Sequence, residues 1–158
     1  MIMLHFEDHK NLSPEPMACW VKLTDLRFLT QCIPNVESVV ESRPDQIRFK
    51  LRPGVSFVRG SLEVTLKVDK VELGKSARYW IHSRGIGSSS DVEAFLTLQP
   101  IENGSHLHWM VDIKSLGGLL RALPQGLIKA SAQKVIGDIW SVVEKKLQPV
   151  PPNQTTGP

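Results

Sequence analysis

The chain has 158 residues, of which 41% are hydrophobic and 22% are charged, which is typical of a globular protein. This length suits one domain with a substantial hydrophobic core rather than two domains. The net charge of +3 arises from 19 basic and 16 acidic residues without a dense Lys/Arg stripe, which argues against a nucleic-acid-binding protein.

The two cysteines, Cys19 and Cys32, are too far apart to form a C-x-x-C motif, so neither a zinc site nor a redox pair is predicted. We expect both to be buried small side chains, because no Lys or His stands at a fixed spacing that would lower a thiol pKa. The N-terminal residues become polar by Glu7 and do not resemble a signal peptide. No apolar run approaches the roughly 20 residues that cross a bilayer. A cytoplasmic protein is therefore expected.

A short strand over residues 2–6 and two short helices are expected first. Ser13 is the candidate N-cap of the first helix, with Pro14 at its first helical position. The second helix is expected over residues 25–33, where apolar residues recur at spacings of three and four. Asp25 or Thr24 is the expected N-cap of this helix.

The helical pattern ends abruptly at Pro34, and a β-branched run begins at Val36. Between them, Asn35 is one of the residues that best tolerate a positive φ. We interpret this junction as a structural corner that turns the chain from helix into strand.

Alternation of apolar and polar residues predicts about six more strands after this corner. The pattern is clearest in residues 45–51, 61–71, 91–100 and 105–114. Turn-forming residues between the runs predict successive hairpins and hence an antiparallel meander with one buried face. The expected turns lie at Pro53–Gly54, Gly74–Lys75, Ser88–Asp91 and Asn103–Gly104.

An amphipathic pattern from Gly118 to Leu147 predicts one long helix, with a kink or break near Pro124 and Gly126. The expected fold class is therefore α+β: a curved antiparallel sheet of six to seven strands wrapped around a long C-terminal helix, with two short helices after the first strand. Residues 1–147 are expected to form this single domain. Residues 148–158 are Pro-rich and polar, which predicts a disordered tail.

Residues 23–39, LTDLRFLTQCIPNVESV, resemble the early signature of the CoxG family, named for the G subunit of carbon monoxide dehydrogenase, within the SRPBCC or START-like helix-grip superfamily. The shared positions are Leu23, Asp25, Leu29, Cys32, Ile33, Pro34 and Val36. A Gly commonly follows the Pro in that family, where this chain has Asn35. The resemblance extends over roughly residues 2–147. A phenylalanine pair near the end of the family's last helix is replaced here by Ile139 and Trp140.

The resemblance implies a non-enzymatic protein that binds a hydrophobic ligand, a lipid or a quinone-like molecule, between the sheet and the long helix. It also implies a role in recruiting or assembling a molybdenum hydroxylase at the inner membrane face. Relatives often carry an apolar anchor after a Pro-rich linker, whereas this sequence ends at Pro158, so we expect no membrane attachment by this chain alone. No cofactor and no catalytic residue is predicted.

The predicted cavity is lined by inward apolar and aromatic residues, as ligand pockets usually are. They are Phe49, Phe57, Leu66, Tyr79, Ile81, Leu96, Trp109, Leu123, Leu127 and Ile139. Tyr79 and either Arg78 or Arg84 are the polar groups expected to orient a ligand. Two alternatives remain: an enzyme such as a cyclase or hydrolase, which needs paired polar groups in the cavity, and an interaction module with an exposed apolar patch and a closed interior.

His106 and His108 are two apart on a predicted strand and therefore share a face, together with Asp112. We expect that face to be the outer one, because Trp109 belongs on the inner one. His82 would have to fold alongside to complete a metal site. Since no third ligand stands at a defined spacing, no metal site is predicted.

Overall fold

The computed structural model describes residues 3–53 and 59–147. Its elements follow the expected order of one strand, two short helices, six strands and a long helix. They are β1 (Leu4–Leu12), α1 (Pro16–Leu23), α2 (Leu26–Cys32), β2 (Val36–Ser42), β3 (Gln46–Leu51), β4 (Leu62–Glu72), β5 (Ser76–Gly85), β6 (Ser88–Ile101), β7 (Gly104–Gly118), the 3-10 helix η1 (Leu119–Ala122) and α3 (Gln125–Leu147). The expected tail and the Gly54 position of the first expected turn lie outside the described residues.

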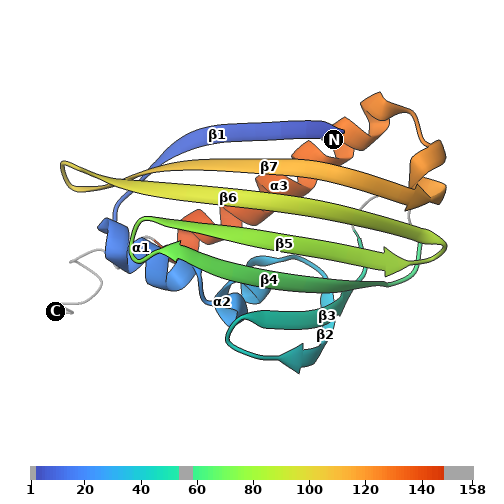
Figure 1. The fold of residues 1–158 in the computed structure, drawn as a ribbon, viewed down its shortest axis with the longest axis horizontal. Helices are drawn as coiled ribbons and strands as arrows, with labels where there is room; N and C mark the ends of the chain where they lie inside the picture. The colour runs from blue at the N-terminus through green and yellow to red at the C-terminus, as the bar shows by residue number, and fades with distance from the viewer. Residues whose placement is uncertain (1–2, 54–58, 148–158) are drawn as a thin grey trace, which may run out of the picture.

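The seven strands form one antiparallel sheet in the order β1-β7-β6-β5-β4-β3-β2. The strands from β2 to β7 pair with their neighbours in sequence, and β1 joins beyond β7 at the other edge. The sheet is curved, and α3 runs obliquely across one of its faces, with α1 and α2 near one end (Figure 1). The predicted helix-grip architecture is confirmed.

The alternation of apolar and polar residues correctly assigns the inner face of the sheet. Phe49, Val64 and Leu66 are buried on the inner face, whereas Lys50 and Lys67 are exposed. Because successive side chains of a strand point to opposite faces, the same parity continues through β5, β6 and β7. The outer face is mostly polar.

The first helix begins two residues later than predicted. Its first residue is Pro16 and its N-cap is Glu15, so the assignment of Ser13 and Pro14 to these positions is wrong.

The first strand, β1, is longer than the predicted residues 2–6, because it pairs with β7 along its whole length. Pro14 lies in the connection, where its carbonyl accepts a hydrogen bond of 2.6 Å from the Ser105 hydroxyl of β7.

The region before α3 is divided differently from the prediction. β7 continues to Gly118 and is followed by η1, and the predicted break occurs at Pro124, whereas Gly126 lies inside α3. The expected turn at Ser88–Asp91 is wrong, since these residues pair with β5 and β7 as part of β6. The chain turns instead at Ile86 and Gly87, whose φ angles are 58° and 69°.

Both ends of α2 are built as predicted, with Asp25 rather than Thr24 as the cap at its start and Asn35 at the corner before β2. The Asp25 side chain caps α2 by accepting hydrogen bonds from the backbone N–H groups of Arg27 (3.0 Å) and Phe28 (3.4 Å). Asn35 has a φ of 66°, a conformation that β-branched residues adopt only under strain. The position therefore selects Asn or Gly.

Substitution at Asn35 should separate backbone strain from side-chain contacts. We expect Asn35→Val to lower the free energy of unfolding by about 1–2 kcal/mol, because Val is strained at positive φ. Asn35→Gly should leave stability within about 0.5 kcal/mol of the parent. Urea denaturation of the three proteins measures this difference, and equal midpoints for the Val and Gly variants would contradict the assigned role.

Candidate functional site

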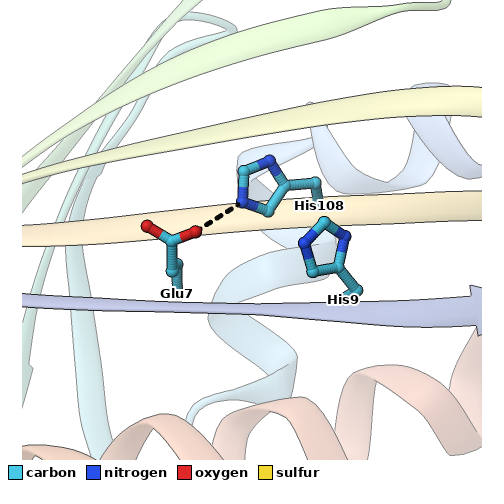
Figure 2. Close-up of side chains that lie close together, drawn as sticks. All are labelled: Glu7, His9 and His108. Atoms are coloured by element: carbon cyan, nitrogen blue, oxygen red, sulfur yellow. Dashed lines mark hydrogen bonds and ion pairs between the residues drawn. The ribbon is translucent and has the colours of Figure 1, made fainter.

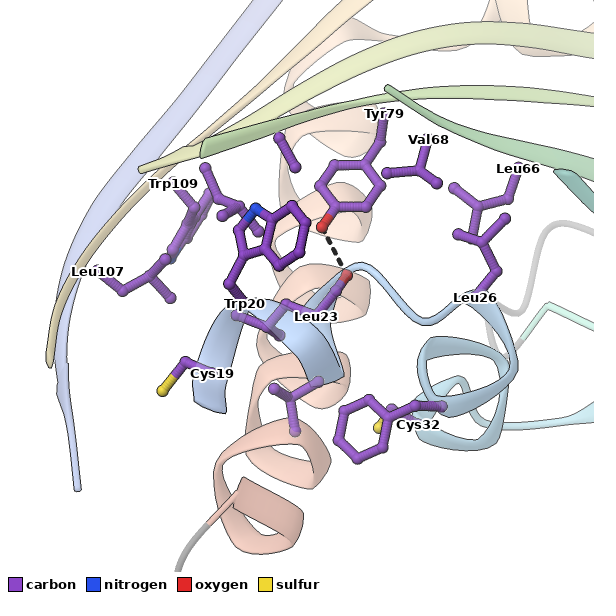
Figure 3. Packing of buried hydrophobic residues seen from close by; sticks show 14 of the residues in the cluster. Cys19, Trp20, Leu23, Leu26, Cys32, Leu66, Val68, Tyr79, Leu107 and Trp109 are labelled. Atoms are coloured by element: carbon purple, nitrogen blue, oxygen red, sulfur yellow. Dashed lines mark hydrogen bonds between the residues drawn. The ribbon is translucent and has the colours of Figure 1, made fainter. Parts of the chain in front are cut away.

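The best-packed part of the interior lies where α1, α2 and the last turns of α3 meet the sheet. Trp20 and Leu23 of α1 and Leu26 of α2 point toward the inner residues of β4, β5 and β7 (Figure 3). Within the described part of α3, only Val143 and Leu147 are buried. This end of the molecule is therefore a filled hydrophobic core.

Two aromatic side chains use their polar atoms to fasten α1 to this core. The Tyr79 hydroxyl donates a hydrogen bond of 2.6 Å to the Leu23 carbonyl (Figure 3), and the Trp20 indole N–H donates one of 3.0 Å to the Ser76 carbonyl. Burial raises the pKa of Tyr79 above its usual value, so the hydroxyl keeps its proton. Tyr79 serves here as a structural donor, and its proton is not available to a ligand.

The rest of α3 covers the sheet less completely. Over its first 18 residues no side chain is fully buried, although several apolar ones pack partly against the interior. The sheet offers a similar set of half-buried apolar residues on its inner face. These two sets are Ile128, Ala132, Ile136, Ile139 and Trp140 on α3, and Ile81, Val92, Ala94, Val111 and Leu116 on the sheet. They form the candidate ligand-binding surface.

Trp109 lies beside this surface with an unsatisfied polar atom. The residue is 7% exposed, its ring stacks on that of Trp140 with centroids 5.9 Å apart, and its indole Nε1 has no hydrogen-bond acceptor among the described residues. A buried donor without an acceptor costs about 1–3 kcal/mol. The carbonyl oxygen of an apolar ligand would remove this penalty. The sequence pattern predicts Trp109 as part of an apolar wall and does not reveal this N–H group.

The predicted cavity residues occupy three environments. Phe49, Leu66, Tyr79, Leu96 and Trp109 are buried in the core, Ile81, Leu123 and Ile139 are half-buried, and Leu127 on α3 is 40% exposed. Phe57 lies outside the described residues. Ile81 and Ile139 belong to the candidate ligand-binding surface, and contact of any of the predicted residues with a ligand stays a prediction.

The two arginines expected to orient a ligand lie on the outer face. The Arg78 guanidinium stands over the rings of Trp80 (5.3 Å) and Phe95 (5.8 Å), and an Arg84 nitrogen is 3.8 Å from a Glu63 carboxylate oxygen. The expectation that either would contact a ligand on the inner face is therefore wrong.

Two open hollows lie at other places on the surface. One, of about 590 Å³, lies at the ends of β3 to β7 and is lined by Lys50, Ser61, Leu62, Glu63, Arg84, Gly85, Gly87, Ser88, Ser89 and Gly118. The other, of about 610 Å³, lies between α2 and the β2–β3 hairpin and is lined by Arg27, Thr30, Gln31, Ile33, Asn35, Val36, Val39, Ser42 and Ile47. None of the predicted cavity residues that the structure describes lines either hollow.

His106 and His108 share the outer face, as predicted, but their neighbours are residues of β1 rather than His82. His82 instead lies 2.6 Å from Asp91 on β6.

The Glu7 carboxylate on β1 accepts hydrogen bonds from His5 and His108. These two bonds, the one from His5 most strongly, lower the pKa of Glu7 below its usual value.

The two cysteines are buried as expected. Burial raises the pKa of both the Cys19 and the Cys32 thiol. A raised pKa keeps each thiol protonated, which disfavours nucleophilic chemistry.

A family model, that of the carbon monoxide dehydrogenase G subunit (CoxG), matches residues 11–148. Among solved structures, a conserved protein from Geobacillus kaustophilus superposes with a TM-score of 0.81 at 21% identity, covering 91% of this chain and 95% of that one. A START superfamily protein from Mycobacterium smegmatis gives 0.67 at 12% identity, with 90% and 96% covered. A Thermus thermophilus protein gives 0.64 at 14%, with 91% and 97% covered.

The search of curated proteins found no match. Among the described residues, none of the helices combines the length and the apolar character needed to span a membrane.

Removing the Tyr79 hydroxyl should weaken the attachment of α1 to the sheet. We expect Tyr79→Phe to reduce the free energy of unfolding by about 1–2 kcal/mol, because the buried Leu23 carbonyl loses its donor. Trp80→Phe, one residue away on the outer face, should change it by less than about 0.5 kcal/mol. Chemical denaturation followed by circular dichroism measures both, and a Tyr79→Phe variant as stable as the parent would show that the bond contributes nothing.

Proposed function

The chain belongs to the CoxG family, and on that premise we propose that it binds a hydrophobic ligand between the sheet and α3. The fold supports this, because a single long helix covers the inner face and leaves apolar side chains of both layers half-buried. Covering that surface with the hydrocarbon part of a ligand would be favourable by about 25 cal/mol for each Å² removed from water.

The observation that carries the proposal is the unsatisfied indole N–H of Trp109. It restricts the chemistry of the ligand, since the donor requires an acceptor that reaches a mostly apolar surface. A quinone-like headgroup or a lipid with an ester carbonyl has both the apolar body and the acceptor oxygen. A flat ring would also suit the neighbouring indoles of Trp109 and Trp140.

The inner face favours binding over catalysis. The Ser83 and Ser90 hydroxyls there are hydrogen-bonded to each other. Lys10 of β1 and Glu144 of α3 form an ion pair of 2.6 Å, which ties the helix to the edge strand. These groups are satisfied by one another, and Asp8, the carboxylate opposite Trp109 in the register of β1 and β7, accepts a hydrogen bond from the backbone N–H of His9. A cyclase or hydrolase on this fold remains the second candidate, and turnover of a bound ligand would identify it.

Membership of the family also supports a biological setting. We infer a cytoplasmic protein that works at the inner membrane face, where it recruits or helps to assemble a molybdenum hydroxylase. Residues 1–147 would be the ligand-binding domain and residues 148–158 a Pro-rich tail. Co-purification from the native source, with the partner identified by mass spectrometry, tests this setting.

Ligand binding should raise the thermal stability of the delipidated protein. A ligand present at 100 times its Kd adds about 2.7 kcal/mol, which shifts the melting temperature by several degrees. A thermal-shift assay over a panel of quinones, fatty acids and phospholipids measures the effect. If a well-folded sample shows no shift with any of them, the interaction module becomes the better description.

Trp109→Phe should separate the hydrogen bond from the apolar contacts. We expect about five- to tenfold weaker binding of the quinone or ester that gives the largest shift, which corresponds to about 1–1.4 kcal/mol. Binding of a hydrocarbon of similar length should change by less than about twofold. Because the N–H has no acceptor in the described structure, the ligand-free variant loses no hydrogen bond, and we expect its stability to fall only by the weaker packing of Phe in the place of the buried indole.

The matched control is Trp80→Phe, which alters an indole on the outer face and should leave both affinities unchanged. Equal affinity of the parent and the Trp109→Phe variant for the carbonyl ligand would place that ligand away from Trp109.

A further inference from the structure

Four histidines and a glutamate lie on the outer face of β1 and β7, and one of them, His5, is hydrogen-bonded to Asp112 and Glu7. We call Glu7, His9, His106 and His108 the outer histidine cluster. Glu7 and His9 are two apart on β1, and His106 and His108 are two apart on β7, so all four side chains leave the same face. The antiparallel register places His9 directly opposite His108. Pairing of the first and last strands therefore assembles the cluster from opposite ends of the chain.

Three of these side chains each bring a possible metal-ligand atom into one small region of this face. One donor atom from each of Glu7, His9 and His108 lies within 4.8 Å of the others. The Glu7 Oε1 and His108 Nε2 atoms are 3.2 Å apart, and the rings of His9 and His108 stack with centroids 4.2 Å apart (Figure 2). We propose that Glu7, His9 and His108 bind a divalent transition-metal ion of the zinc class.

A hydrogen-bond chain determines which nitrogen of His9 is available. Asn11 Oδ1 lies 2.8 Å from His106 Nδ1, so that nitrogen carries the proton and donates it. In the neutral His106 ring Nε2 is then the acceptor, and it lies 2.9 Å from His9 Nδ1, which donates in that arrangement. In the neutral His9 ring the lone pair is therefore on Nε2. A ligating histidine whose other nitrogen donates to a neighbour is the usual arrangement at metal sites.

The donor set selects the class of metal. Two imidazole nitrogens and one carboxylate oxygen suit Zn²⁺, Co²⁺ or Ni²⁺ better than Mg²⁺ or Ca²⁺, which prefer oxygen ligands. Zinc–ligand distances of about 2.0–2.1 Å bring tetrahedral donors to about 3.3 Å from one another. For both histidines to bind one ion, the His9 ring must turn out of its stack on His108, and Glu7 must share its carboxylate with His5. Glu7 and His9 are exposed, so rotation about their side-chain bonds allows this. The fourth position faces solvent and would hold water.

The metal would connect the edge strand to the sheet. β1 pairs only with β7 among the described strands, and Glu7 and His9 stand near its middle. A bridge from β1 to His108 would resist fraying of this edge. This function is independent of the ligand proposed for the opposite face.

Metal titration of the untagged, chelator-treated full chain tests the proposal. We expect isothermal calorimetry with Zn²⁺ to give one saturable site per chain, and Co²⁺ to give the visible absorption of a tetrahedral or five-coordinate ion. His9→Ala and His108→Gln should each weaken Zn²⁺ binding by about tenfold or more. His106→Gln should weaken it less than His9→Ala does, by about tenfold, because His106 orients the ligating His9 ring without touching the ion.

The matched control is His82→Gln, which removes an outer-face histidine paired with Asp91 and should leave Zn²⁺ binding unchanged. Circular dichroism confirms that each variant is folded. The proposal is overturned if the parent shows no saturable site, or if folded His9→Ala and His108→Gln variants bind as tightly as the parent, in which case the cluster is a hydrogen-bonded polar surface only.

Discussion

The attachment of α1 to the inner face of the sheet is the constraint on which the rest of the structure depends. The Tyr79 and Trp20 side chains reach from opposite directions, one from β5 to α1 and one from α1 to β5, and each ends on a backbone carbonyl. Together with the buried turns of α3 at Val143 and Leu147, they close one end of the sheet. We infer that the packed core at this end supplies the stability of the domain, so that the apolar side chains between the sheet and the first turns of α3 can stay half-buried.

Successive side chains of β7 point to opposite faces of the sheet, so this one strand contributes to both candidate sites. Trp109 points inward to Trp140, while its neighbour His108 points outward to Glu7 and His9. β1 and β6 flank β7, so both side chains are presented from a strand that is paired on both sides. A rigid position of this kind is what a binding residue needs. On the two proposals above, the strand would offer a ligand contact on one face and a metal ligand on the other without a change of backbone.

Most of the fold is predictable from the sequence because its signals are local: alternation indicates the strands, Asp25 the cap of α2, and Asn35 the corner. The errors lie where a distant contact decides. The predicted first strand is too short because polar residues follow Phe6. One of them, Lys10, points inward and forms an ion pair with Glu144 of α3, a contact between distant parts of the chain that the local pattern does not show. The predicted start of α1 is wrong because both Pro14 and Pro16 suit a first helical turn, and the contact of the Pro14 carbonyl with β7 excludes the first of them.

The candidate sites are less predictable for the same physical reason. Glu7 and His9 alternate in a way that places them on one face, but their meeting with His108 depends on the register between the first and last strands. The sequence shows that Trp109 carries an indole N–H donor. It does not show whether an acceptor lies opposite that N–H group in the folded protein. Trp20 and Tyr79 have acceptors in the backbone. Trp109 is the buried aromatic donor left without one in the described structure, and a carbonyl-bearing ligand between β7 and α3 would supply what the protein itself does not.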